Sequence, residues 1–157
     1  MDKYTIELPI IRESVSHSGL LDITKSSPVE YRDALEKLAL YFKREFKYDS
    51  IQFTANEHFQ GHSEYKGFAF TKPAPGSMKK EYPEIPTRFI GGDCFRKDGS
   101  NDHEYWCLDW VWIHPYERNK GLFSTHIEYF KEKFGDFIPE GPLSKAMHHI
   151  YFSKVST

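Results

Sequence analysis

The sequence predicts an α/β domain of the α+β type, with one mixed and mostly antiparallel sheet flanked by helices. Two segments, 28–45 and 122–134, carry apolar side chains at helical spacing. Two others, 88–96 and 105–114, are dense in aromatic and β-branched residues and predict strands. Because helices and strands alternate without an internal repeat or a linker, we expect a single domain over residues 1–157.

The first half of the chain predicts one helix and several short strands. Pro28 suits the first turn of a helix, and the helical spacing continues from there to residue 45. A run of lysine, prolines and glycine over 72–76 predicts a break in regular structure. The strand candidates in this half are short and only partly alternating: Lys3–Ile10, Ile51–Thr54 and Gly67–Thr71.

The second half has a sharper pattern. The turn-forming residues Lys97–Ser100 separate Arg88–Arg96 from Tyr105–His114, which predicts a β-hairpin. Pro115 then ends the second strand. Leu122–Phe134 follows as an amphipathic helix. The remaining expected features are a stop at Gly135, a short strand at Phe137–Ile138 and a last helix over Pro142–Ser153.

Composition narrows the class of partner. The net charge is −2 and the basic residues are dispersed, so the basic face of a nucleic-acid binder is not expected. Two cysteines are too few for a disulfide scaffold at this length. No apolar run approaches the roughly 20 residues that span a bilayer, and Met1–Ile10 lacks the apolar core of a signal peptide. We therefore expect a cytoplasmic protein that binds neither nucleic acid nor membrane.

The segment from Trp110 to Ser124 predicts an anion site. A strand ends at Pro115, a polar loop with Arg118, Lys120 and Gly121 follows, and a helix then begins. The first amides of a helix have no intrahelical partner, and the helix dipole adds partial positive charge there. Glycine allows close approach of a ligand to the backbone. The alternative is an ordinary strand–turn–helix connection with a glycine cap.

This segment resembles the cofactor motif of the GNAT superfamily of acyl-CoA-dependent N-acetyltransferases. The family pattern is an apolar strand, then Arg or Gln-x-x-Gly-x-Gly or Ala at a helix start. Ile113, Pro115, Arg118 and Gly121 fall in register, whereas Phe123 stands where Gly or Ala is usual. The resemblance implies a GNAT-like fold, acetyl-CoA as co-substrate and no metal.

The resemblance also implies a cofactor-binding set. Backbone groups of the strand end would hold the pantetheine arm, and amides of the loop and first helical turn would hold the pyrophosphate. These residues are Val111, Trp112, Ile113, Arg118, Asn119, Lys120, Gly121, Leu122, Phe123 and Ser124.

Two catalytic roles follow for Asp109 and Tyr151. Asp109 is an acid inside an otherwise apolar strand, where simple alternation places it with Cys107 and Val111, and it is the candidate base for the amine. Its alternative is a structural ion pair with a neighbouring cation. Glu104 is a weaker candidate base. By resemblance, Tyr151 on the last helix would return a proton to the thiolate, although a core or surface ring is the competing interpretation.

Other chemistry is less well supported. Cys107 has no His–Asp relay near it in sequence, so a buried structural thiol is expected rather than a nucleophile. His58 and His62 have a spacing that metals use, but no paired cysteines accompany them. Simple alternation places Trp106, Trp110 and Trp112 on one strand face, opposite Asp109, where they would pack against a helix.

We therefore expect an acetyl-CoA-dependent N-acetyltransferase that acts on a small-molecule or protein amine by direct attack. Family members usually continue past the last helix with a strand hairpin that this sequence lacks. The acceptor side would then be open, built from residues 55–86, or completed in a homodimer. The alternatives are a non-catalytic GNAT-fold module that binds a CoA-like ligand or a protein partner, and an interaction protein with an aromatic surface.

Overall fold

The computed structural model describes residues 6–11, 19–47, 53, 64–74, 86–100 and 103–139. Two helices, six strands and one short 3-10 turn occur in these ranges. In chain order they are β1 Ile10–Ile11, β2 Leu20–Ile23, α1 Val29–Phe46, β3 Tyr65–Pro73, β4 Thr87–Ser100, β5 His103–Ile113, the 3-10 turn Pro115–Glu117, α2 Leu122–Phe134 and β6 Ile138–Pro139.

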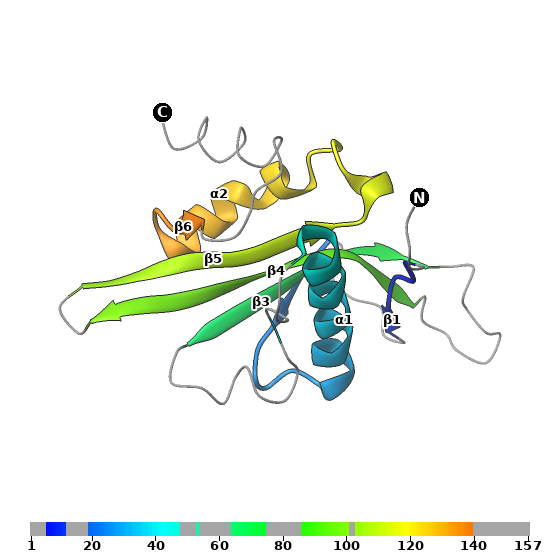
Figure 1. The fold of residues 1–157 in the computed structure, drawn as a ribbon, viewed down its shortest axis with the longest axis horizontal. Helices are drawn as coiled ribbons and strands as arrows, with labels where there is room; N and C mark the ends of the chain where they lie inside the picture. The colour runs from blue at the N-terminus through cyan, green and yellow to red at the C-terminus, as the bar shows by residue number, and fades with distance from the viewer. Residues whose placement is uncertain are drawn as a thin grey trace.

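The strands form one mixed sheet in the order β2-β3-β4-β5-β6, with β1 paired to the beginning of β4. Every pairing is antiparallel except that of β5 with β6, which is parallel. Figure 1 shows α1 on one side of this sheet and α2 on the other. The predicted class, a mostly antiparallel mixed sheet flanked by helices, is confirmed.

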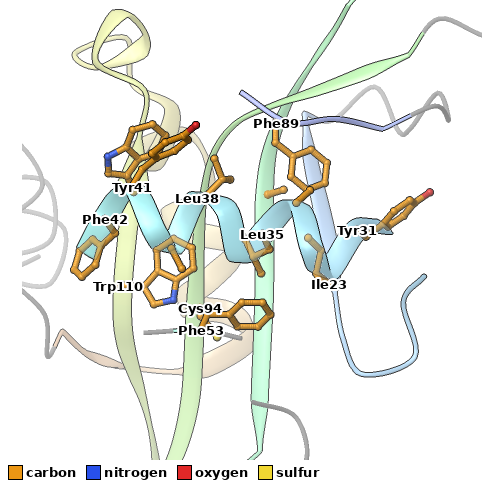
Figure 2. Packing of buried hydrophobic residues seen from close by; sticks show 14 of the residues in the cluster. Ile23, Tyr31, Leu35, Leu38, Tyr41, Phe42, Phe53, Phe89, Cys94 and Trp110 are labelled. Atoms are coloured by element: carbon orange, nitrogen blue, oxygen red, sulfur yellow. The ribbon is translucent and has the colours of Figure 1, made fainter. Parts of the chain in front are cut away.

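The α1 helix covers one face of the sheet with a stripe of apolar side chains. Leu35, Leu38 and Phe42 recur at helical spacing and are fully buried. Figure 2 shows them directed at the strands beneath, where Phe42 packs against Trp110 of β5 with ring centroids 6.0 Å apart. The helix ends at Lys47, whose left-handed backbone (φ 58°) caps it.

The α2 helix covers the opposite face, and its core is built from rings. Phe123, Phe130 and Phe134 are buried there. Phe134 stacks on Phe95 of β4 with centroids 4.3 Å apart. Many of the aromatic side chains therefore pack between α2 and the sheet.

Several predicted boundaries differ from the structure. The expected turn at Lys97–Ser100 is wrong, because β4 continues through these residues and pairs Ser100 with His103. Cross-strand ion pairs stabilise this extension, since Lys97 lies 3.4 Å from Glu104. β2 was not predicted. Of the expected strand Lys3–Ile10, the described residues before Ile10 are not in a strand.

Other predicted segments lie outside the described residues. The last helix, Pro142–Ser153, is among them, and of Ile51–Thr54 only Phe53 is described. Phe53 is fully buried and is not in a strand.

A glycine of β4 permits α1 to lie close to the sheet. A Cβ on Gly92 would stand 2.7 Å from Leu35 and 3.1 Å from Leu38, both fully buried. We expect Gly92→Ala to lower the free energy of unfolding by about 1–3 kcal/mol, as overpacked cores do. Urea denaturation measures the change. The loss should shrink in a Leu35→Ala background, and an unchanged midpoint in the single variant would contradict this account.

Candidate functional site

A β-bulge at Asp109 divides β5 into two halves. Cys94 pairs with Trp110 and Phe95 pairs with Leu108, which leaves Asp109 as an extra residue in β5. An extra residue reverses the alternation of side chains between the two faces. The bulge therefore determines where every side chain of the second half of β5 points.

This reversal corrects two expectations that rested on simple alternation. Trp106 packs against Phe134 on the α2 face, whereas Trp110 and Trp112 belong to the core beneath α1. The three tryptophans therefore do not share a face. For the same reason Asp109 does not form one face with Cys107 and Val111, since the bulge separates these two residues.

The Asp109 carboxylate is ion-paired. Arg96 Nε donates to both of its oxygens at 3.2 Å, and only 11% of the Asp109 side chain is exposed. Arg96 also donates from Nη1 to Asp98 at 2.8 Å. The hydrogen bond from Arg96, together with one from the Gly99 amide, lowers the pKa of Asp98. The structural partner that we considered for Asp109 is thus present.

Beyond the bulge, one edge of β5 is open. β6 pairs with β5 at Cys107 and Leu108, and no other described strand lies along this edge up to Ile113. His114 N–H donates to Ile90 of β4 at 2.9 Å, and successive backbone groups point to opposite edges. The N–H groups of Val111 and Ile113 therefore point to the open edge.

The same geometry places the backbone of Trp112 differently from that of Val111 and Ile113. Its backbone is directed at β4, where it pairs with Gly92, so it is not available at the open edge. The carbonyl of Ile113 is also occupied, because Arg118 Nε donates to it at 2.7 Å. The groups that remain are both backbone groups of Val111 and the N–H of Ile113.

The loop after β5 leads to amides at the start of α2 that have no hydrogen-bond partner among the described residues. Asn119 and Gly121 have left-handed backbones, with φ of 63° and 75°. No side chain caps the helix. The hydroxyls of Ser124 and Thr125 instead donate to the Gly121 carbonyl, at 3.1 and 2.6 Å. The N–H groups of residues 122–124 thus remain available to an anion.

The two basic side chains of the loop, Arg118 and Lys120, have different surroundings. Arg118 does not extend from the loop; its guanidinium meets Glu45 of α1 at 2.5 Å. Lys120 is the exposed cation, with 58% of its side chain accessible and Glu117 at 3.8 Å. Formal positive charge at the helix start therefore comes from Lys120 rather than from Arg118.

Phe123, the departure from the motif, points away from the loop. Its side chain is 2% exposed and packs against Phe130, with centroids 5.5 Å apart. A bulky residue is tolerated here because it fills the core under α2.

Comparisons with known proteins bear on the fold. No family model matches the sequence, and no curated protein matches it significantly. Among solved structures, a ribosomal-protein-alanine N-acetyltransferase from Brucella melitensis biovar Abortus superposes with a TM-score of 0.52 at 10% identity. The match covers 87% of this chain and 89% of that one. The chain has the GNAT fold.

Two further solved structures are similar at lower scores. A possible acetyltransferase from Clostridium difficile gives a TM-score of 0.47 at 9% identity, covering 88% of this chain and 90% of that one. An aminoglycoside acetyltransferase from an uncultured soil metagenomic sample gives 0.46 at 12% identity, covering 88% and 86%. At these scores the two likenesses carry no further argument about this chain.

The structure gives the positions of some of the other candidate residues, and the rest lie outside the described residues. Cys107 is fully buried, and Glu104 lies near the far end of the hairpin beside Lys97. Tyr151, His58 and His62 are outside the described residues. Among the residues that are described, no group of three or more potential ligands clusters as a metal site. No helix in that part is long and apolar enough to cross a membrane.

Two acids of this GNAT-fold domain were not singled out from the sequence. Asp93 of β4 is fully buried opposite Val111, and neither of its oxygens has a hydrogen-bond partner in the described part. Burial raises the pKa of Asp93 well above its usual value. Glu45 lies in the last turn of α1. The signal for Asp93 was the one that identified Asp109, an acid within an apolar strand.

Proposed function

We propose that this GNAT-fold domain is an N-acetyltransferase that transfers the acetyl group of acetyl-CoA to a primary amine. One observation carries the proposal. The open edge of β5 begins at the Asp109 bulge and leads directly to the uncapped start of α2. Backbone donors for an extended arm and amides for an anion therefore follow one another along a single path.

The described residues fit acetyl-CoA along this path. The carbonyl of Val111 and the N–H of Ile113 would pair with the amide groups of the pantetheine arm, which leaves the N–H of Val111 for the thioester. The pyrophosphate would lie on the amides of residues 119–124, with Lys120 adding charge. Gly121 has a left-handed backbone (φ 75°), which glycine adopts without strain, and it places no side chain beside these amides.

The chemistry needs a neutral amine and a stabilised oxyanion. The amine nitrogen would attack the thioester carbonyl carbon, the C–S bond would break, and an amide would form. Asp109 would take the amine proton, directly or through water, and the thiolate would gain a proton, for which Tyr151 is the candidate donor. The outward N–H of Val111, two residues beyond Asp109, would support the developing oxyanion.

A second candidate function is a non-catalytic module that binds a CoA-like ligand or a protein partner. The Arg96–Asp109 ion pair favours it, because this pair gives the acid a structural role that requires no catalysis. Both candidates keep the acyl-CoA site, and acetyl transfer by the wild-type protein separates them.

Calorimetric titration with acetyl-CoA tests the site that both candidates share. We expect micromolar binding by the wild-type protein and loss of binding in Gly121→Trp, whose indole would occupy the approach to the α2 amides. Glu132→Trp is the control. It places the same side chain at an exposed helical position near the other end of α2, away from the amides of the proposed site. Binding lost equally in both variants, or absent from the wild type, would refute the site.

A further inference from the structure

Glu45 joins the end of α1 to the strand and loop of the proposed site. Its Oε1 accepts a hydrogen bond from Trp112 Nε1 at 3.0 Å and one from Arg118 Nη2 at 2.5 Å. Arg118 in turn donates from Nε to the Ile113 carbonyl at 2.7 Å, and its guanidinium lies over the Trp112 ring, 6.0 Å from the centroid. One carboxylate thus ties the end of α1 to β5 and to the following loop, 67 and 73 residues further along the chain.

The position of Glu45 is electrostatically unfavourable for α1. The carboxyl end of a helix favours cations, and the same turn does contain Lys43 and Arg44. An acid there is opposed by the helix dipole, so local helix stability does not account for it. Its two hydrogen bonds, to the strand and the loop that form the proposed site, do account for it.

The Arg118 guanidinium already has hydrogen-bond partners within the protein when no ligand is bound. Two of its nitrogens are engaged, by Glu45 and by Ile113, and about a third of the side chain is exposed. Arg118 directly precedes Asn119, the first left-handed residue of the loop. Holding the Arg118 side chain therefore holds the backbone from which the α2 amides are presented.

We propose that Glu45 is a positioning residue for acyl-CoA binding, acting through Arg118 to preorganise the loop before α2. The inference rests on the proposed function. Preorganisation lowers the ordering cost of binding, and one immobilised side chain corresponds to roughly a threefold to tenfold gain in affinity. On this account Arg118 shapes the anion site and does not itself bind the phosphates.

The change in acetyl-CoA affinity caused by Glu45→Gln has opposite signs in this account and in one where Arg118 binds the phosphates. If Arg118 bound the pyrophosphate, removing the charge of Glu45 would free a cation and tighten binding. If Glu45 positions the loop, Glu45→Gln weakens acetyl-CoA binding by roughly three- to tenfold. Glutamine keeps an oxygen that accepts from Trp112 and Arg118 but removes the charge that holds the guanidinium. Asp33→Asn, which removes an exposed acid from the same helix, should leave the dissociation constant unchanged.

The experiment combines calorimetry with hydrogen exchange of the ligand-free protein. We expect Glu45→Gln to weaken binding, to add no further loss in an Arg118→Ala background, and to speed exchange of the amides at 116–124. Unchanged or tighter binding by Glu45→Gln, or unchanged exchange in this loop, overturns the inference. Absence of binding by the wild-type protein overturns the proposed function instead, while the exchange measurement still tests the link from Glu45 to the loop.

Discussion

Replacing Asp109 by asparagine is expected to lower kcat for acetyl transfer by about 10²–10⁴-fold, the contribution of a positioned general base. Asparagine retains the size of the side chain and an acceptor for Arg96 but does not take a proton at neutral pH. The KM for acetyl-CoA should change little, because the backbone of β5 and α2 forms that site. Release of the CoA thiol, measured with a primary amine that supports turnover, gives both constants.

Asp98→Asn is the matched control for this prediction. Asp98 also pairs with the Arg96 guanidinium, but its side chain is 43% exposed. It lies two residues beyond Arg96 in β4, away from the bulge. We expect kcat of this variant to remain close to the wild-type value. If both variants retain wild-type kcat, Asp109 is a structural partner of Arg96 and the proton is taken by another group. A wild-type protein that binds acetyl-CoA but transfers no acetyl group to any amine would favour the non-catalytic module.

Replacing Asp93 by asparagine is expected to stabilise the protein at neutral and alkaline pH by about 1–3 kcal/mol. Asparagine does not ionise, whereas each pH unit over which folded Asp93 holds a proton that the unfolded chain has lost costs about 1.4 kcal/mol. The sign follows from the raised pKa of Asp93. Above pH of about 4, unfolded aspartate loses its proton while folded Asp93 keeps it. The folded state then binds more protons, so wild-type stability falls as the pH rises through this window.

Urea denaturation between pH 4 and pH 8 measures this effect. Wild type and Asp93→Asn should have similar stability at the acid end, and their curves should diverge as the pH rises. Asp22→Asn, at an exposed aspartate of β2, should follow the wild type throughout. Parallel curves for wild type and Asp93→Asn would show that Asp93 does not change its proton affinity on folding.

Much of the fold was predictable because its signals are local. The α2 boundaries, Leu122 and Phe134, follow from apolar spacing and from Gly135, which lies just past the helix. The hairpin of β4 and β5 follows from two apolar segments close in sequence. The turn at Lys97–Ser100 was misplaced because cross-strand ion pairs, which local propensity ignores, extend the strands.

The candidate site was predictable only in part. The sequence by itself determined the strand, the loop and the helix start, since glycine at residue 121 and the motif around it act through the backbone. Only the tertiary structure decided where the side chains point. A single inserted residue at Asp109 reverses the faces of β5, and no local pattern distinguishes a bulged strand from a regular one. The pairings of Arg118 with Glu45 and of Arg96 with Asp109 likewise depend on which elements meet in space. The spacing of residues in the sequence does not predict these contacts.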